Sequence, residues 1–297
     1  MTDISFGIKT SQSGIGYADI LRIWQEAEAV DAFADAWLWD HMVPLRGPVD
    51  GAALEAWTLL AALAARTTRL RLGVIVTSNR LRPPAVLAKM AATVDVISAG
   101  RLNFGIGAGG SAVSDPNGLA MVRREFDAYG IDIVPPRTAV AALAEACALI
   151  KRMWTENEPF DFTGEHYQLT GAVCAPKPVQ QPRPPIMIGS GGERFGLRVV
   201  AEHADIWNCP IWGGGDELRR KSAILDEHCA AIGRDPATIT RSVQLLLRSP
   251  DPAPARDALL DLIDAGARHL VLAPIPPVPS VRRLADEIVE PVLAQLG

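Results

Sequence analysis

The sequence predicts an α/β fold: a (β/α)8 TIM barrel with insertions after strand 4 and in the 154–184 region. Strand-like and helix-like segments alternate along all 297 residues, which is typical of a parallel sheet whose strands are joined by helices. The segments group into eight strand–helix units, the number found in a TIM barrel. A doubly wound sheet is the competing topology, but it rarely needs eight repeats. We therefore expect one barrel domain over residues 1–297.

The expected strands are short and apolar, as buried parallel strands are. They lie near residues 4–9, 36–40, 71–77, 101–106, 185–189, 205–208, 239–247 and 268–273. The expected helices lie near residues 17–31, 54–65, 84–98, 137–153, 194–203, 214–232, 255–265 and 281–295. The stretch 69–110 shows the alternation most clearly, because Pro83 and Pro84 open its helix and Gly100 ends it.

Two connections exceed the usual length of loops in a barrel. Residues 107–136 are rich in glycine, serine, aspartate and proline, and residues 154–184 contain alternating aromatic residues followed by a proline-rich stretch. The alternation predicts a small hairpin around Gly164. Long insertions in a compact domain are usually lids or binding loops, and we expect the same of these two.

Composition excludes several classes of protein. The net charge is −5 and no basic run is present, which disfavours binding to nucleic acid. The longest apolar runs are shorter than a bilayer span, and no signal peptide precedes Ser5. The cysteines are widely spaced without a Cys-x-x-Cys pair: Cys147, Cys174, Cys209 and Cys229. We expect a cytoplasmic protein with free thiols, no disulfide framework and no metal site.

Asp40 and His41 directly follow the second expected strand, which places them at the carboxyl rim of a barrel. A histidine there can donate a hydrogen bond or relay a proton near neutral pH. A purely structural role, in which Asp40 caps a loop, fits the position equally well. Metal-dependent hydrolysis is disfavoured, because the first expected strand, residues 4–9, lacks a His-x-His pair.

The glycine-rich run 105–110 ends the fourth expected strand. It is not a dinucleotide fingerprint, because no helix starts promptly after it and no acidic residue follows at the required distance. Close approach of the backbone to a flat ring system fits better. Thr77, Ser78 and Asn79 follow the third expected strand, and their side chains could bond the polar edge of a heterocycle.

The segment 185–194 runs from a buried strand into Gly-Ser-Gly-Gly and then into a helix that carries Arg194 and Arg198. Free amide groups at a helix start together with a guanidinium group form an anion site. A tight turn between strand and helix also requires glycine, but we favour phosphate binding.

Taken together, these residues resemble the luciferase-like monooxygenase superfamily of flavin and deazaflavin enzymes. The resemblance covers nearly the whole chain. Three motifs resemble the branch that uses coenzyme F420: Leu-Gly-x-x-Val-Thr at 72–77, Pro-Ala-Val-Leu-Ala-Lys at 84–89, and Gly-Arg-Leu-x-x-Gly-Ile-Gly-Ala-Gly at 100–109. The resemblance implies a barrel that holds the ring at its carboxyl mouth, with a non-proline cis peptide bond behind the ring at the bulge after the third strand.

From the motifs and the resemblance we expect His41 to be catalytic. The expected cofactor-binding residues are Asp40, Ile75, Val76, Thr77, Gly107, Ala108, Gly109, Ser190, Gly191, Gly192 and Arg194. The expected reaction is hydride transfer between F420 and a small organic substrate. Two alternatives remain open: a monooxygenase that uses FMN and molecular oxygen, and a cofactor-binding barrel without catalysis.

The chain departs from the sugar-phosphate dehydrogenases of this superfamily at two positions. Those enzymes carry a tryptophan where Leu45 stands and a glutamate where Gly110 stands. The glutamate handles a proton in that chemistry, so we do not expect a sugar phosphate as substrate. The resemblance also implies a homodimer formed through early helices, and the apolar stretch 53–63 could supply the interface or pack on the barrel.

Overall fold

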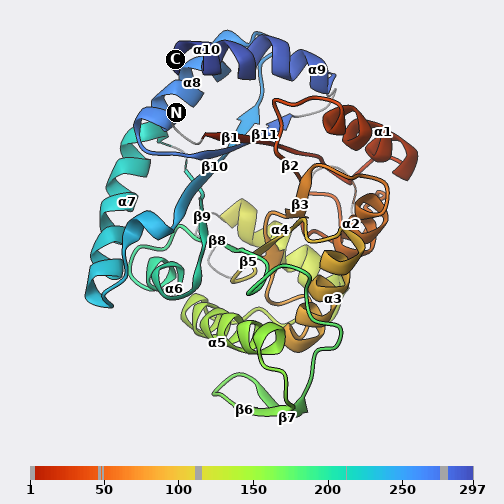
Figure 1. Cartoon of the computed structure of the whole chain (residues 1–297), viewed down its shortest axis with the longest axis vertical. Coiled ribbons are helices and arrows are strands. Elements are labelled where there is room, and N and C mark those ends of the chain that lie inside the picture. The colour runs from red at the N-terminus through yellow and green to blue at the C-terminus, as the bar shows by residue number, and fades with distance from the viewer. Residues whose placement is uncertain are drawn as a thin grey trace.

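The computed structural model describes residues 4–45, 48, 50–110, 116–211, 213–274 and 280–296. Its central feature is a closed ring of parallel strands surrounded by helices (Figure 1). The strands, in their order around the barrel, are β3 (Arg71–Val74), β2 (Asp35–Leu38), β1 (Ser5–Lys9), β11 (His269–Pro274), β10 (Thr240–Leu247), β9 (Ile206–Cys209), β8 (Ile186–Gly189) and β5 (Leu102–Gly107). Pairing of β3 with β5 closes the ring, which confirms the expected TIM barrel.

The third strand is interrupted, unlike the continuous strand expected over 71–77. β3 ends at Val74, and the two-residue strand β4 (Thr77–Ser78) then resumes pairing with β5. Ile75 and Val76 form the bulge between them, and this bulge includes a cis peptide bond between these two residues. The cis bond that the resemblance implied is therefore present.

The helices cover the outside of the barrel close to where the sequence predicts them. They are α1 (Tyr17–Glu28), α2 (Ala56–Ala64), α3 (Pro84–Ile97), α5 (Pro136–Thr155), α6 (Gly196–His203), α7 (Gly214–Ala231) and α8 (Ala253–Asp264). The expected helix over 281–295 consists of α9 (Val281–Leu284), a π-helical segment (Ala285–Val289) and α10 (Glu290–Leu296). A short 3₁₀ turn (Pro236–Thr238) precedes β10.

One helix was not expected. Within the insertion 107–136, residues Pro116–Ala128 form α4, and residues 111–115 lie outside the described part of the chain. Leu119, Val122 and Phe126 recur at helical spacing in this stretch. The helix is mostly polar and follows a glycine-rich stretch, so its sequence resembles that of a loop.

The second insertion contains the predicted hairpin. β6 (Phe160–Thr163) and β7 (Gln168–Ala172) pair antiparallel. The turn between them is tied to α5, because the Glu145 carboxylate accepts hydrogen bonds from the backbone N–H groups of Glu165, His166 and Tyr167 at 2.8, 2.9 and 3.2 Å. This attachment fixes the position of Tyr167, whose role at the site is described below.

The proline-rich stretch that follows the hairpin is anchored by a buried carboxylate. Asp95 on α3 accepts hydrogen bonds from the backbone N–H groups of Val179 and Gln180 at 2.8 and 3.0 Å, and from the Gln180 side chain at 2.7 Å. Several donors converge on one acceptor group that is out of contact with water, an arrangement expensive to disrupt. The chain therefore enters β8 along a fixed path.

The interior of the barrel is filled by side chains and is not an open channel. Trp37, Ile75, Met187 and Val271 form a compact buried cluster, and they come from strands on different sides of the ring. A larger apolar core lies between the strands and the outer helices.

The cysteine side chains of the chain are all free and buried, as expected. Burial raises the pKa of both Cys147 and Cys209 to about 12, which keeps these thiols protonated and unreactive. Among the described residues, no helix is both long and apolar enough to span a bilayer.

Candidate active site

Three segments that are distant in the sequence meet at one rim of the barrel. The register of the sheet places Ser78 beside Gly107 and Gly107 beside Gly189. The bulge after β3 and the ends of β5 and β8 are therefore contiguous. Because all the barrel strands are parallel, the end of β2, with Asp40 and His41 after it, opens onto the same rim.

Asp40 joins the end of β2 to the bulge. Its Oδ2 atom accepts a hydrogen bond from the Ser78 backbone N–H at 2.9 Å, and both carboxylate oxygens pair with Arg82 at 2.9 and 3.0 Å. Arg82 also pairs with Glu55 on the other side. Burial raises the pKa of Asp40, and the hydrogen bonds from Arg82 and Ser78 oppose that shift. The side chain is thus committed to orienting the loop.

His41 reaches the mouth and is held by a carboxylate. Its Nδ1 atom lies 3.1 Å from Oε2 of Glu125, and its ring meets the Trp39 indole edge-on with centroids 5.6 Å apart. The His41 side chain is 31% exposed, whereas that of Glu125 is only 5% exposed. When the carboxylate is ionised, Nδ1–H donates to it, which leaves Nε2 free to exchange a proton with a ligand.

Glu125 is the main site residue that sequence reasoning missed. It lies on α4, and its Oε1 atom also accepts a hydrogen bond from the backbone N–H of Met42 at 2.5 Å. The neighbouring Arg124 donates to the Pro44 carbonyl, and the Tyr129 hydroxyl donates to the Met42 carbonyl at 3.3 Å. The only available signal was the helical spacing of apolar residues in this insertion.

Val76 explains why two strand ends require glycine. A Cβ atom at Gly107 would lie 2.9 Å from Cγ2 of Val76, and one at Gly189 would lie 2.7 Å from the same atom. The sequence suggested that glycine here admits a ring, but the immediate neighbour is this valine of the bulge. The two glycines let the bulge pack against β5 and β8, and Ile75 continues this packing into the interior cluster.

The end of the glycine run makes a second close contact with the bulge. Gly109 has a φ of 88°, and a Cβ atom there would lie 2.5 Å from the Ser78 hydroxyl oxygen. Only glycine fits this position without strain. Ala108, which precedes it, is half-buried and packs against the main core.

Thr77 differs from the expectation. Its side chain is completely buried, and its hydroxyl oxygen accepts a hydrogen bond from the Trp57 indole at 3.1 Å. The hydroxyl therefore belongs to the wall between the bulge and α2, and direct contact with a ring through this side chain has no support in the structure. The interruption of the strand made this orientation towards α2 hard to foresee.

Asn79, the third polar residue of this segment, connects the rim with the hairpin of the second insertion. Its amide nitrogen donates to the Tyr167 hydroxyl at 3.0 Å. Its side-chain oxygen is buried and has no hydrogen-bond partner among the described residues. An unsatisfied buried acceptor is costly, so a ligand N–H is the kind of partner that would complete it. The pyrimidine edge of a flavin or deazaflavin carries such a group.

The Gly-Ser-Gly-Gly loop after β8 has one open side. A Cβ atom at Gly192 would meet only the backbone nitrogen of Gly196, at 3.8 Å, which lies at the start of α6. Gly191 is closely packed, because a Cβ atom there would lie 2.9 Å from Cγ of Pro210 and 3.4 Å from Nζ of Lys221. Open space bordered by a helix start and an ammonium group suits an anion. Ser190 contributes its carbonyl to the frame, since it accepts a hydrogen bond from Trp207 at 2.8 Å.

The cation beside this loop is Lys221, whereas the sequence pointed to Arg194. Lys221 on α7 is buried and pairs with Glu217 at 2.7 Å. Arg194 is exposed, and its guanidinium carbon lies 5.0 Å from the centroid of the Phe195 ring. Lys221 was missed because it is part of a helix whose charged residues resemble a solvated face.

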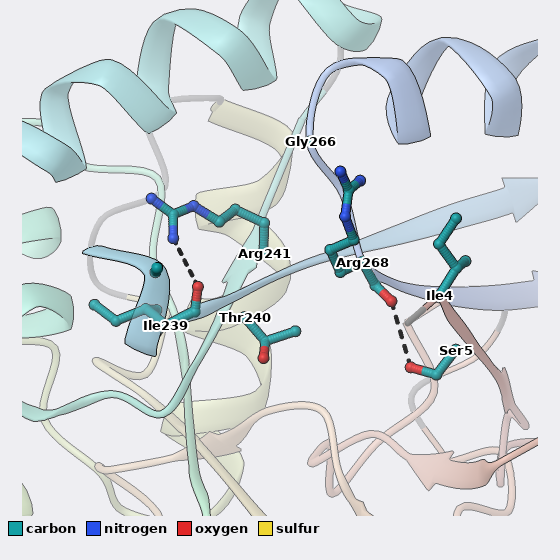
Figure 2. A pocket seen from close by; sticks show the side chains of 8 residues that line it. Ile4, Ser5, Ile239, Thr240, Arg241, Gly266 and Arg268 are labelled. Atoms are coloured by element: carbon teal, nitrogen blue, oxygen red, sulfur yellow. Dashed lines mark hydrogen bonds between the residues drawn. The ribbon is translucent and has the colours of Figure 1, made fainter. Parts of the chain in front are cut away.

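A separate hollow of about 730 Å³ lies at the opposite end of the barrel (Figure 2). Ser5 and Thr240, the first residues of β1 and β10, line it together with Arg241 and Arg268. Both arginines donate hydrogen bonds to nearby backbone carbonyl groups. Since the strands are parallel, this hollow cannot share ligands with the carboxyl rim.

A closed parallel barrel whose polar, titratable and glycine-rich strand ends gather at the carboxyl rim is the arrangement of barrel enzymes. Residues 2–288 match the model of the luciferase-like monooxygenase family, so the chain belongs to that family of oxidoreductases. The resemblance noted from the motifs is confirmed.

Two relatives illustrate the match. The chain is 34% identical over 296 residues to an F420-dependent glucose-6-phosphate dehydrogenase of Kineococcus radiotolerans, which covers 96% of this chain and 80% of that protein. It is 31% identical over 213 residues to a phthiodiolone/phenolphthiodiolone dimycocerosates ketoreductase of Mycobacterium sp. (strain JLS), which covers 71% of this chain and 52% of that protein.

Solved structures confirm the fold. An F420-dependent secondary alcohol dehydrogenase in complex with an F420-acetone adduct superposes with a TM-score of 0.82 at 17% identity, covering 98% of this chain and 99% of the other. The F420-dependent tetrahydromethanopterin reductase from Methanopyrus kandleri superposes with a TM-score of 0.77 at 18% identity, covering 98% and 99%.

The contact between Val76 and the strand ends generates a first prediction. Replacing Gly189 with Ala should lower the free energy of unfolding by about 1–3 kcal/mol, because the new methyl group overlaps Val76. Adding Val76→Ala should recover part of that loss, since its two Cγ atoms make the overlap. Urea unfolding of the two single variants and the double variant measures the coupling. Strictly additive losses would show that the two residues are not in contact.

Proposed function

We propose that this chain is an oxidoreductase that transfers a hydride between coenzyme F420 and a small organic substrate. The observation that carries the proposal is the convergence, at one rim, of the carboxylate-held His41, the bulge with the strand β4 that follows it, and the loop 190–192. The sequence relatives named for F420-dependent reactions support the choice of cofactor.

The residues at the rim fit the two ends of this cofactor. The bulge, with the unsatisfied oxygen of Asn79 beside it, would hold the deazaflavin ring. The backbone of Ser190–Gly192, next to Lys221, would hold the phosphate. Asp40 acts indirectly, because it fixes the backbone of the bulge through Ser78.

When bound, the deazaflavin accepts or supplies the hydride. The protein must move the accompanying proton, and His41 is placed to do so. If the substrate is a hydroxyl compound, its proton passes to Nε2 of His41 as the carbonyl group forms; in the reverse direction Nε2 returns the proton to the oxygen. Glu125 stabilises the resulting imidazolium and keeps the ring oriented.

A sugar phosphate is not the substrate that we propose. Gly110 has a φ of 70°, and a Cβ atom there would lie 2.9 Å from Val122 of α4, so no glutamate fits this position. The carboxylate near the mouth is instead that of Glu125 on α4, and its partner is His41. Leu45 stands where the sugar-phosphate enzymes carry tryptophan.

A homodimer in the cytoplasm remains part of the proposal. The apolar helix α2 packs on its own barrel through Trp57, Leu60 and Leu63, so it does not present an open apolar face. Light scattering during size-exclusion chromatography should give the mass of two chains. The mass of a single chain at micromolar concentration would remove the dimer from the proposal.

The role of His41 and Glu125 leads to a prediction about turnover. His41→Ala should lower kcat by about 100-fold or more, the usual contribution of a proton-transferring side chain, and should change the F420 dissociation constant by less than threefold. Glu125→Gln, which keeps the shape but removes the charge, should lower kcat and alter its pH profile. Stopped-flow absorbance of F420 and fluorescence titration measure the two quantities.

A control variant shows whether a substitution outside the site affects turnover. Arg22→Gln serves as this control, because Arg22 on α1 is exposed and its ion-pair partner among the described residues, Asp19, lies on the same helix. Unchanged turnover in His41→Ala, with the control also unchanged, would refute the catalytic role.

The proposed phosphate site predicts a selective loss of affinity. Lys221→Met should weaken binding of F420 by about tenfold, comparable to one charge-assisted hydrogen bond, and should not affect the deazaflavin alcohol that lacks the phosphate. Fluorescence titration with both compounds, and with FMN, measures this difference. Equal losses for both deazaflavins would place the phosphate elsewhere. Tighter binding of FMN than of F420 would favour an oxygen-dependent monooxygenase.

A further inference from the structure

Lys9 places an amine inside the barrel near the mouth. It is the last residue of β1, and Phe6 and Ile8 of the same strand belong to the outer core, so alternation directs Lys9 to the interior. Its Nζ atom donates a hydrogen bond to Oε1 of Gln244 at 2.7 Å and lies 5.5 Å from the centroid of the Trp39 ring.

The hydrogen bond to Gln244 is fixed by a chain of side chains through the barrel. Nε2 of Gln244 donates to Asn208 at 2.8 Å, and Asn208 donates to the Ser242 hydroxyl at 3.1 Å. Ser242 lies 2.8 Å from Nδ1 of His269, whose Nε2 lies 3.0 Å from Asp35. This chain orients the amide oxygen of Gln244 towards the amine and leaves the amide no freedom to turn.

The amine has no acidic partner among the described residues. No carboxylate forms an ion pair with Lys9 there, and the interior carboxylate, Asp35, is already paired with His269 and Trp37. An ammonium group has three donors, and one of them is used by a described residue, Gln244. Burial lowers the pKa of Lys9 to about 8. The side chain is partly buried, and a partly buried cation without a counter-charge is costly, so its position suits an anion from outside the chain.

Trp39 connects this amine with the proposed catalytic residue. The indole contacts His41 edge-on and has the Lys9 amine 5.5 Å from its ring centroid. Its own Nε1 atom is buried and has no hydrogen-bond partner in the described structure. Unused donors from two residues therefore occur in the region that a substrate reaches when it approaches His41.

We propose that Lys9 is a substrate-binding residue and that the substrate carries a carboxylate group. The carboxylate would accept hydrogen bonds from the free donors of Lys9, while the reacting part of the same molecule lies at His41. A monoanion balances the single charge of Lys9, whereas a phosphate dianion would leave an unbalanced charge in a poorly solvated interior. The assignment of a carboxylate substrate rests on the proposed function, because that function has the substrate react at His41. Binding of an anion at Lys9 does not depend on it.

The test uses pairs of ligands that differ in charge and little in shape. Isothermal titration calorimetry compares acetate, butyrate and benzoate with acetamide, butyramide and benzamide, using the full chain without added cofactor. At least one acid should bind ten or more times more tightly than its amide. Lys9→Met should abolish that preference, and Lys89→Met, a change at an exposed lysine on α3, should retain it.

A second variant and a folding measurement separate loss of the charge from loss of the folded structure. Lys9→Gln retains a hydrogen-bonding group without the charge, so it should also lose the preference, and thermal unfolding checks that each variant is folded. Absence of an acid-over-amide preference in the unaltered protein, or its persistence in folded Lys9→Met or Lys9→Gln, would overturn the proposal. Because no F420 is present, failure of the F420 titrations would leave this result standing, and the two proposals can fail separately.

Discussion

The buried carboxylate of Asp40 is the interaction on which the arrangement of the rim depends. It reaches from the end of β2 to the backbone of Ser78 and, through Arg82, to Glu55 before α2. Three consecutive barrel segments are thereby held in one geometry at the point where the third strand is interrupted. Val76 of the bulge packs against Gly107 of β5 and Gly189 of β8. The shape of the mouth therefore depends on the Asp40 carboxylate and on these two glycines.

The barrel could be predicted from the sequence because its strands bury both faces. Such strands are apolar throughout, and their alternation with amphipathic helices is visible without any knowledge of contacts. The rim positions of Asp40, His41 and the loop 190–192 follow from the same alternation, since the carboxyl ends of parallel strands share one edge. The cis bond at Ile75–Val76 came from the resemblance and not from the residues themselves.

The remaining features depend on contacts between distant positions, which a single sequence does not show. Glu125 lies 84 residues beyond His41, on a helix whose polar surface resembles a loop. Thr77 turned out to face Trp57, because the interrupted strand reverses the orientation that a regular strand would give it. Lys9 ends the first expected strand, and only the fold shows that it points into the barrel, where no carboxylate among the described residues pairs with it.

The position of Glu125 on an insertion has an evolutionary consequence. The segment after the fourth barrel strand reaches the rim, where it supplies the carboxylate that supports the histidine. Exchange of that one segment between related genes would therefore alter ligand selectivity and acid–base partner together, while the scaffold stays intact. Diversification of such a barrel can proceed by inheritance of whole segments, without the slow, coordinated substitution of separate residues.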